Sequence, residues 1–472
     1  MINNYLVQQI KGNFLYKPTL EQENTVKNIA DFIFSPNKMT AFILKGYAGT
    51  GKTSLIAAVV NTWDKLQKKC ILLAPTGRAA KVLSHYSSHS AFTIHKKIYR
   101  QKSFSNEIEN FSLNDNLYSD TLFIVDEASM ISNEGLSGSV FGTGRLLDDL
   151  IEFVYSGKNC RLLLIGDTAQ LPPIGEFESP ALSTEMIKGY GIEVFESILT
   201  QVVRQLDESG ILYNATQLRN KISNEEFDFL PKLSLNKFPD IMSINGNDLI
   251  EKINECYDKT SIEDTMIICR SNKRANIYNK GIRNSILYRE DELNSGDLLM
   301  IAKNNYFWTA NSKEIDFIAN GDIGVVKRVR KTREMYGFRF ADIVLSLPDY
   351  NDIEIEVKVI LDTLHSDGAS LPKEQNDKLF YTILEDYKDI SLKRERMKKM
   401  KEDVHYNALQ VKYAYAITGH KAQGGQWKKV FIDQGYMTDE MLTPDYYKWL
   451  YTAITRATET LYLVNWPKSQ ME

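Results

Sequence analysis

Short uninterrupted runs of apolar residues alternate with amphipathic stretches through the first two hundred residues of this 472-residue chain. The runs at 41–44, 70–74, 121–125 and 161–165 are of strand length and show no regular polar alternation. This pattern is typical of parallel strands that are covered on both faces. A helical pattern at 54–60 follows the first run. Such strand–helix alternation predicts a doubly wound α/β domain with a parallel sheet.

A second set of apolar runs predicts another α/β domain in the second half of the chain. These runs lie at 265–269, 412–416, 429–432 and 461–464. The stretch between the first two has a different pattern, in which a turn signal at 320–322 precedes alternating segments at 341–345 and 353–357. We therefore expect a small antiparallel β insertion. The charged run 392–402 is expected to form a solvent-exposed helix that leads back to the core.

The composition limits the class of protein. Hydrophobic residues make up 43% and charged residues 25% of the chain, which is an ordinary balance for a globular protein. The chain is too long for one hydrophobic core, so two to four domains are expected. The net charge of −4 does not exclude a nucleic-acid binder, because a local basic groove is enough to follow a phosphate backbone.

The cysteines and the apolar segments indicate the cellular compartment in which the protein is expected. The four cysteines lie far apart without a C-x-x-C pair, which argues against a zinc site or a disulfide framework and favours a reducing cytoplasm. The N-terminal residues do not have the pattern of a signal peptide, and no apolar run has the length of a membrane span. We therefore expect a cytoplasmic protein without a membrane partner.

A phosphate-binding loop is the clearest chemical motif. Gly46-x-x-x-x-Gly51-Lys52-Thr53 lies between an apolar strand run and a helical pattern, which is the context that gives this motif its meaning. The glycines let backbone N–H groups surround a phosphate, and the helix N-terminus adds its dipole. Lys52 is expected to reach the β- and γ-phosphates, and Thr53 to ligate Mg²⁺.

Further groups complete a hydrolytic site. Asp126 and Glu127 follow an apolar run, where Asp126 would hold Mg²⁺ and Glu127 would orient the attacking water. Gln170 follows another run and could sense the γ-phosphate. Arg204 and Arg456 are candidates to stabilise the transition-state charge, although a surface ion pair is the default for any single arginine. Since no pocket for a phosphoryl acceptor is indicated, a hydrolase is favoured over a transferase.

Short motifs also follow one another in a fixed order. In chain order they are Gln22, the loop 46–53, Ala74-Pro75-Thr76-Gly77-Arg78-Ala79-Ala80-Lys81, Thr93-Ile94-His95, Asp126-Glu127-Ala128-Ser129, Gly166-Asp167-x-x-Gln170-Leu171-Pro172-Pro173-Ile174-Gly175, Val203-Arg204-Gln205, Thr418-Gly419-His420-Lys421-Ala422-Gln423-Gly424 and Tyr451-Thr452-Ala453-Ile454-Thr455-Arg456-Ala457. Over roughly residues 18–465 the chain resembles superfamily 1 helicases of the B subgroup, which includes RecD-like and Dda-like enzymes. The ordered series is far more specific than any single motif.

The resemblance implies that ATP and Mg²⁺ bind in a cleft between two RecA-like domains. Gln22 would recognise adenine, and Arg204 and Arg456 would reach the γ-phosphate from the second domain. Gln423 and Gly424 would couple the nucleotide to the DNA. The nucleotide-binding residues implied in this way are Gln22, Gly46, Ala48, Gly49, Thr50, Gly51, Lys52, Thr53, Gln423 and Gly424.

The resemblance also implies a track for single-stranded DNA across both domains. The matching positions are Pro75, Thr76, Arg78, Thr93, His95, Thr418, His420 and Lys421. Threonine and histidine are neutral hydrogen-bonding groups that suit phosphate and sugar contacts without sequence preference. Taken alone, each histidine would more simply be a structural residue; the intact flanking motifs favour the DNA contact. The family moves 5′ to 3′, and the resemblance alone implies this polarity.

The resemblance further divides the chain into domains. We expect a first motor domain (1–97 plus 120–200), a hairpin pin (98–119), a second motor domain (201–325 plus 405–472) and an SH3-like β insertion (326–404). Phe104 and Phe111 are candidate tip aromatics of the pin for stacking on the last base pair, although a core or loop position is equally compatible with the sequence. The Gly/Ser-rich stretch 135–144 is expected to be a flexible loop, and we assign it no function.

The leading hypothesis is a monomeric, stand-alone ATP-dependent DNA helicase. It would act on single-stranded DNA and on junctions of single and double strands, together with other repair, recombination or replication proteins. One alternative is a RecD-like motor subunit of a larger complex. Another is a translocase that unwinds weakly or prefers RNA, because contacts to 2′-hydroxyl groups cannot be seen in sequence. A nuclease is not indicated, since no further cluster of carboxylates and lysine lies outside the motor motifs.

Overall fold

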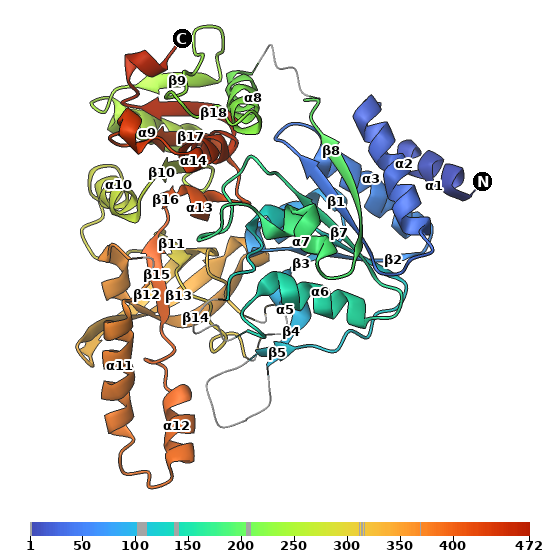
Figure 1. Ribbon diagram of the computed structural model, residues 1–472. Coiled ribbons are helices and arrows are strands. Elements are labelled where there is room, and N and C mark those ends of the chain that lie inside the picture. The colour runs from blue at the N-terminus through green and yellow to red at the C-terminus, as the bar shows by residue number, and fades with distance from the viewer. Residues whose placement is uncertain are drawn as a thin grey trace.

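The computed structural model describes residues 2–101, 111–135, 141–203, 209–310, 312, 315, 317–368 and 370–472. It contains two α/β domains, a small barrel beside the second of them, and a pair of helices that extends from the barrel (Figure 1). This arrangement confirms the predicted fold class of two RecA-like domains with a β-hairpin and an SH3-like insertion. In the described part of the chain, no helix is long and apolar enough to cross a membrane.

The first motor domain is built on a six-stranded parallel sheet of order β3-β2-β6-β7-β1-β8. The strands are β1 (Thr40–Gly46), β2 (Lys69–Ala74), β3 (Ala91–Thr93), β6 (Thr121–Val125), β7 (Arg161–Gly166) and β8 (Glu193–Leu199). The helices are α1 (Ile2–Gly12), α2 (Leu20–Phe34), α3 (Lys52–Lys65), α4 (Gly77–Ser87), α5 (Ile94–Ile98), α6 (Leu146–Ser156) and α7 (Thr184–Lys188). The prediction of a doubly wound domain is confirmed here.

Both faces of this sheet are covered. Successive residues of β1 belong to different cores, because side chains alternate across a strand. Ala41 and Ile43 belong to the apolar cluster on one face, and Phe42 and Leu44 belong to the cluster on the other. All four are fully buried. Burial on both faces explains why the strand run in the sequence is uninterrupted.

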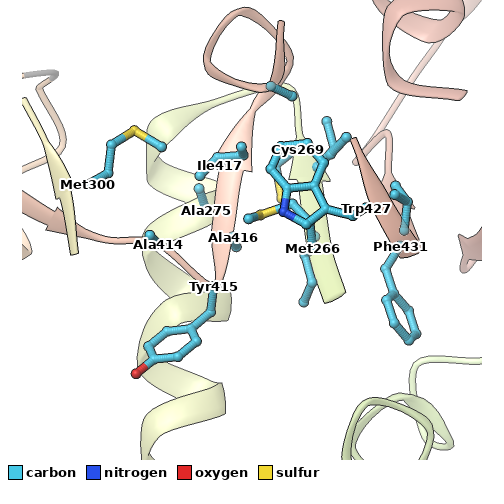
Figure 2. Packing of buried hydrophobic residues seen from close by; sticks show 14 of the residues in the cluster. Met266, Cys269, Ala275, Met300, Ala414, Tyr415, Ala416, Ile417, Trp427 and Phe431 are labelled. Carbon is cyan, nitrogen blue, oxygen red and sulfur yellow. The ribbon is translucent and has the colours of Figure 1, made fainter. Parts of the chain in front are cut away.

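The second motor domain has a five-stranded parallel sheet of order β16-β10-β17-β18-β9. Its strands are β9 (Ile241–Ile244), β10 (Thr265–Cys269), β16 (Ala416–Thr418), β17 (Trp427–Asp433) and β18 (Ala457–Val464). Its helices are α8 (Gly210–Ser223), α9 (Leu249–Lys259), α10 (Asn272–Ser285), α13 (Gly419–Ala422) and α14 (Pro444–Ile454). Figure 2 shows part of its core, where β10, β16 and β17 contribute side chains such as Met266, Ile417 and Phe431.

The insertion is a closed barrel of β11 (Leu298–Ile301), β12 (Ile323–Met335), β13 (Phe338–Leu347), β14 (Ile353–Ile360) and β15 (Leu409–Tyr413). The strands pair antiparallel except for β14 and β15, which are parallel. The barrel thus includes residues outside the predicted range 326–404, because β11 and β15, which close it, lie before and after that range. The helices α11 (Lys373–Asp386) and α12 (Lys393–Lys401) extend from it between β14 and β15 (Figure 1).

The apolar run 412–416 was predicted to be one strand of the second sheet, and this prediction is wrong. The chain leaves the barrel after β15 and joins the sheet only at β16. At the break, the Asn279 side chain accepts hydrogen bonds from the N–H groups of Tyr415 (3.0 Å) and Ala416 (2.8 Å). These bonds replace partners that a continuous strand would have, so a buried side chain allows two sheets to share one apolar run.

Candidate nucleotide and DNA site

The phosphate-binding loop has the predicted strand–loop–helix form. β1 ends at Gly46 and α3 begins at Lys52. Gly49 and Gly51 have φ of 77° and 80°, a left-handed conformation that favours glycine. A Cβ at Gly51 would lie 2.4 Å from Nε2 of Gln22. Backbone conformation and a close contact therefore both require glycine at position 51.

Gln22 supports the loop from α2. Its backbone and side chain form a capping box with Thr19 at the helix N-terminus, in which Oε1 accepts from the Thr19 N–H (3.0 Å). Its Nε2 donates to the Thr50 carbonyl (3.1 Å). The side chain is buried beside the loop. This placement is compatible with the implied contact to adenine, which stays a prediction.

Lys52 carries the positive charge of the loop. Its Nζ donates to the backbone carbonyls of Gly46 and Tyr47, the second at 3.0 Å. Among the residues that the structure describes, no carboxylate forms an ion pair with it. The carbonyls hold the ammonium at the loop without neutralising it, which leaves its charge for phosphate groups.

The acidic pair follows β6 as predicted. The Glu127 N–H donates to Oδ1 of Asp126 (2.9 Å), and Glu127 has a left-handed backbone with φ of 51°. Burial raises the pKa of Asp126, and the nearby Glu127 carboxylate raises it further. The hydroxyl of Thr53 and the carboxylate of Asp126 are hard oxygen ligands that fit Mg²⁺. No group of three or more His, Cys, Asp or Glu that could hold a metal occurs in the described chain.

Gln170 follows β7 and is buried. Its Oε1 has no hydrogen-bond partner among the described residues, and neither has the buried hydroxyl of Ser129. Buried polar atoms are nearly always paired, so each of these two atoms is suited to a polar partner from outside the described chain. A triphosphate with its attacking water fits that requirement.

Arg456 is the residue of the second domain that is predicted to contact the γ-phosphate. It lies just after α14, is 4% exposed, and donates to the carbonyls of Thr452 (3.0 Å) and Gly425 (3.3 Å) and to Oγ1 of Thr455 (3.1 Å). It has no ion pair with a carboxylate in the described part of the chain. A buried guanidinium held only by neutral groups fits a phosphate partner. Arg204 lies outside the described residues.

The predicted coupling residues lie where the two motor domains meet. Nε2 of Gln423 donates to the carbonyl of Leu171 (2.6 Å). Gly424 has φ of 71°, and a Cβ there would approach Cβ of Ala79 at 3.1 Å and Oγ1 of Thr76 at 3.3 Å. The second domain therefore contacts both the loop after β7 and the start of α4 through these two residues.

The threonines expected on the DNA track stand at helix starts. Thr76 caps α4 by accepting from the Ala79 N–H (3.2 Å), and Thr93 caps α5 by accepting from the Lys96 N–H (3.2 Å). Pro75, which precedes Thr76, is partly buried. The two hydroxyl groups therefore stabilise the starts of their helices, and their contact with DNA stays a prediction.

The second domain presents Thr418, His420 and Lys421 at α13. Thr418 is the N-cap residue of this short helix but makes no side-chain cap bond. Burial lowers the pKa of His420, and burial lowers the pKa of Lys421 to about 8. Nζ of Lys421 donates to Oδ1 of Asn320. These three residues thus form a partly buried, weakly charged surface.

Arg78, whose predicted contact with DNA stays a prediction, lies against the second domain. Its guanidinium is 4.1 Å from the centre of the Trp427 ring and donates to the Gln426 carbonyl (3.0 Å). Both partners belong to the second domain. Arg78 therefore joins the two motor domains across their interface, because a delocalised cation stacks well on an indole ring.

The predicted pin is present as a hairpin of β4 (Tyr99–Gln101) and β5 (Phe111–Leu113). Phe104 lies outside the described residues. The prediction of a tip position is wrong for Phe111, which is 9% exposed and lies 4.2 Å from the Tyr306 ring and 5.0 Å from the Phe141 ring, measured between centres. Its contacts come from segments distant in sequence, and they bury the ring.

His95 belongs to the same aromatic group. Its ring is 4.8 Å from Phe141 and edge-on to it, and it lines a pocket of about 280 Å³ with Tyr99, Phe111 and Phe317. Burial lowers the pKa of His95 to about 4. The imidazole is therefore neutral at physiological pH, which agrees with its expected use as an uncharged hydrogen-bonding group.

Comparisons with known proteins show which families this chain is similar to. Residues 19–234 match the model of an AAA domain, and residues 413–464 match the model of a UvrD-like helicase C-terminal domain. A segment of 134 residues is 34% identical to the ATP-dependent RecD2 DNA helicase of Deinococcus radiodurans, covering 28% of this chain and 16% of that protein. These matches support a superfamily 1 helicase of the RecD-like and Dda-like type.

Two other proteins are similar to this chain over nearly its whole length. An uncharacterized protein of Acanthamoeba polyphaga mimivirus is 23% identical over 525 residues, which is 93% of this chain and 98% of that protein. The structure of the Pif1 helicase from Bacteroides in complex with ADP-AlF3 and single-stranded DNA is 16% identical, with a TM-score of 0.48 and coverage of 96% and 94%.

The sequence-based prediction assigned no role to Asp167, Tyr451 or Thr452. All three lie inside motifs that carried the family resemblance. Thr452 accepts from the Leu171 N–H through Oγ1 (2.9 Å), a bond between the two motor domains. Their position inside these motifs could have indicated a role. The contacts between the motifs, which are far apart in the sequence, are known only from the fold.

Proposed function

We propose that this helicase hydrolyses ATP in the cleft between its motor domains and thereby moves 5′ to 3′ along single-stranded DNA and unwinds duplex DNA. One observation carries the proposal. Direct hydrogen bonds hold the second domain, which contains the buried Arg456, against the first domain, which contains Lys52 and the acidic pair. This contact supports the proposal that the three groups are complementary halves of one hydrolytic site.

Each group has a role that its surroundings support. Lys52 and Arg456 are cations without carboxylate partners in the described chain, so both suit the negative charge of the γ-phosphate. Thr53 and Asp126 would hold Mg²⁺, which screens the phosphate charge when bound. Glu127 orients water for in-line attack, and Gln170 accepts a hydrogen bond from that water through its unpaired Oε1.

Movement follows from a site that is divided between two domains. Hydrolysis removes the γ-phosphate that the two halves share, so the cleft alternates between closed and open forms. Thr76 and Thr93 in the first domain and Thr418 in the second are neutral groups at helix starts, which suits sugar and phosphate contacts of either domain. We propose that the hairpin of β4 and β5 is the pin that separates the strands.

The polarity and the choice of DNA rest on similarity. The RecD2 relative is named as an ATP-dependent DNA helicase, and the polarity is that of the RecD-like and Dda-like group. A role in DNA repair or recombination and a cytoplasmic location belong to the same proposal.

The test is a strand-displacement assay on two otherwise identical duplexes, one with a 5′ single-stranded tail and one with a 3′ tail. We expect ATP-dependent displacement of the 5′-tailed duplex and little of the 3′-tailed one. Displacement from the 3′ tail alone would contradict the polarity. Strong DNA-stimulated ATP hydrolysis without displacement of either duplex would instead identify a translocase.

A further inference from the structure

Tyr451 crosses the interface between the motor domains. It lies on α14 of the second domain and is 1% exposed. Its hydroxyl donates to Oδ2 of Asp167 (2.7 Å) and accepts from the N–H of Ala48 (2.9 Å). Ala48 belongs to the phosphate-binding loop, and Asp167 follows β7. One phenol thus joins three sequence motifs.

The direction of these two bonds is fixed by chemistry. An ionised carboxylate and an amide N–H can each act in only one sense, so the hydroxyl must donate to Asp167 and accept from Ala48. Burial raises the pKa of Tyr451 well above its ordinary value, and the Asp167 carboxylate raises it further. The hydroxyl therefore stays protonated at neutral pH and can donate to Asp167.

The loop after β7 is also fixed to the second domain at a second place. The Leu171 N–H donates to Oγ1 of Thr452, the residue after Tyr451, and the Leu171 carbonyl accepts from Gln423. Oδ1 of Asp167 accepts from the Ala169 N–H (2.9 Å), which orients the carboxylate. Asp167 is therefore held rigidly, and Tyr451 is the part of this network that reaches the phosphate-binding loop.

We propose that Tyr451 is a positioning residue that couples the phosphate-binding loop to α14 and so to Arg456. The N–H of Ala48 bonds to Tyr451 of the second domain, so this bond would transmit a displacement of the loop by nucleotide to α14. Arg456 follows the last turn of that helix and moves with it. This inference rests on the proposed ATP hydrolysis and adds the element that transmits the state of the loop to the second domain.

The test substitution is Tyr451→Phe, which removes the hydroxyl and keeps the ring. Tyr447→Phe is a matched control, because Tyr447 lies one turn earlier on α14, is fully buried, and donates to the Phe229 carbonyl outside the phosphate-binding site. Both variants lose one buried hydroxyl from the same helix. A purely structural effect would therefore be similar in the two.

We expect Tyr451→Phe to lower the kcat of DNA-stimulated ATP hydrolysis by about tenfold, because a buried N–H and a buried carboxylate lose a partner. The KM for ATP should stay within about threefold, since Lys52 and Thr53 are intact. The number of base pairs unwound per ATP should also fall. Tyr447→Phe should match the wild type in kcat and in base pairs per ATP.

Equal kcat and equal base pairs per ATP in the two tyrosine variants would overturn the inference. If Tyr451→Phe does not fold, Asp167→Ala removes the acceptor from the other side and must give the same split between kcat and KM; wild-type values for it would overturn the inference equally. Absence of ATP hydrolysis by the wild type with DNA would reject the proposed function itself, which is a separate result.

Discussion

The proposed nucleotide cleft and the proposed DNA face of this chain contain different kinds of residue. The cleft contains cations, Lys52 and Arg456, that backbone carbonyls hold but that no carboxylate neutralises in the described structure. The DNA face contains neutral groups, Thr76, Thr93 and His95, that already cap helices or pack in an aromatic cluster. The cations of the cleft are free to pair with an anionic ligand, whereas the neutral groups of the DNA face also stabilise the fold.

This difference predicts which substitutions change ATP hydrolysis or DNA binding without changing the free energy of unfolding. A buried charge without a counter-ion costs desolvation energy, so its removal need not destabilise the fold. A capping hydroxyl stabilises its helix by typically about 1 kcal/mol, so its removal affects stability as well as binding. The comparison can be tested by measuring both quantities for each residue.

The largest effect is expected for Arg456→Ala. Loss of a cation at the γ-phosphate should lower DNA-stimulated ATP turnover by about 10³–10⁵-fold. The thermal unfolding midpoint should stay close to that of the wild type, because the lost hydrogen bonds are offset by relief of charge burial. Turnover by phosphate release and unfolding by calorimetry measure the two. Turnover within tenfold of the wild type would remove Arg456 from the site.

Glu127→Gln should have the next largest effect. The change keeps the shape of the side chain and removes the carboxylate that orients water, so turnover should fall by about 10²–10⁴-fold. Binding of a fluorescent ATP analogue should be retained. Single-turnover hydrolysis and equilibrium binding, measured together, separate the two steps. Loss of binding with no change in the hydrolytic step would assign Glu127 a different role.

Thr93→Ala tests the double use of the DNA face. Loss of the cap of α5 should destabilise the protein by about 0.5–2 kcal/mol and weaken binding of single-stranded DNA. Thr93→Ser keeps the hydroxyl that accepts from the Lys96 N–H and should restore the unfolding midpoint. Denaturant unfolding and fluorescence anisotropy with labelled DNA are the measurements. Weaker DNA binding without any loss of stability would show that the cap is not structural.

His95 should give the smallest effect, on the pH dependence of stability. Burial lowers its pKa to about 4, so the folded protein keeps it neutral while the unfolded chain protonates it below its ordinary value. The unfolded state then binds more protons, and stability falls with decreasing pH. Between pH 7.5 and 5.5 the wild type should lose up to about 1 kcal/mol relative to His95→Gln.

The DNA affinity provides the other half of this test. Because His95 stays neutral in the fold over that range, the ratio of wild-type to His95→Gln affinity for single-stranded DNA should be the same at pH 7.5 and pH 5.5. An increase in this ratio at the lower pH would mean that the imidazole binds DNA as a cation.

The local parts of the site were predictable from the sequence. The glycines of the phosphate-binding loop, the acidic pair after β6 and the parallel strands follow from patterns within a few residues, because backbone geometry and strand burial are local properties. The first sheet and the loop between β1 and α3 have the predicted form.

Contacts between segments distant in sequence were not predicted. Phe111 is buried because Phe141 and Tyr306 lie against it, and Arg78 stacks on Trp427 of the other domain. The run 412–416 is divided between the barrel and the second sheet, and an apolar pattern shows burial but not which sheet provides it. Pairing of this kind depends on the tertiary fold.

Lys52→Ala is the most direct test of the claim that this cleft hydrolyses ATP. The substitution removes the loop cation, whose side chain, among the described residues, bonds to carbonyls of the loop itself. It should leave the rest of both domains unchanged. We expect DNA-stimulated phosphate release to fall by at least about 10²-fold relative to the wild type, measured side by side with the same DNA. Hydrolysis by Lys52→Ala at the wild-type rate would contradict the account.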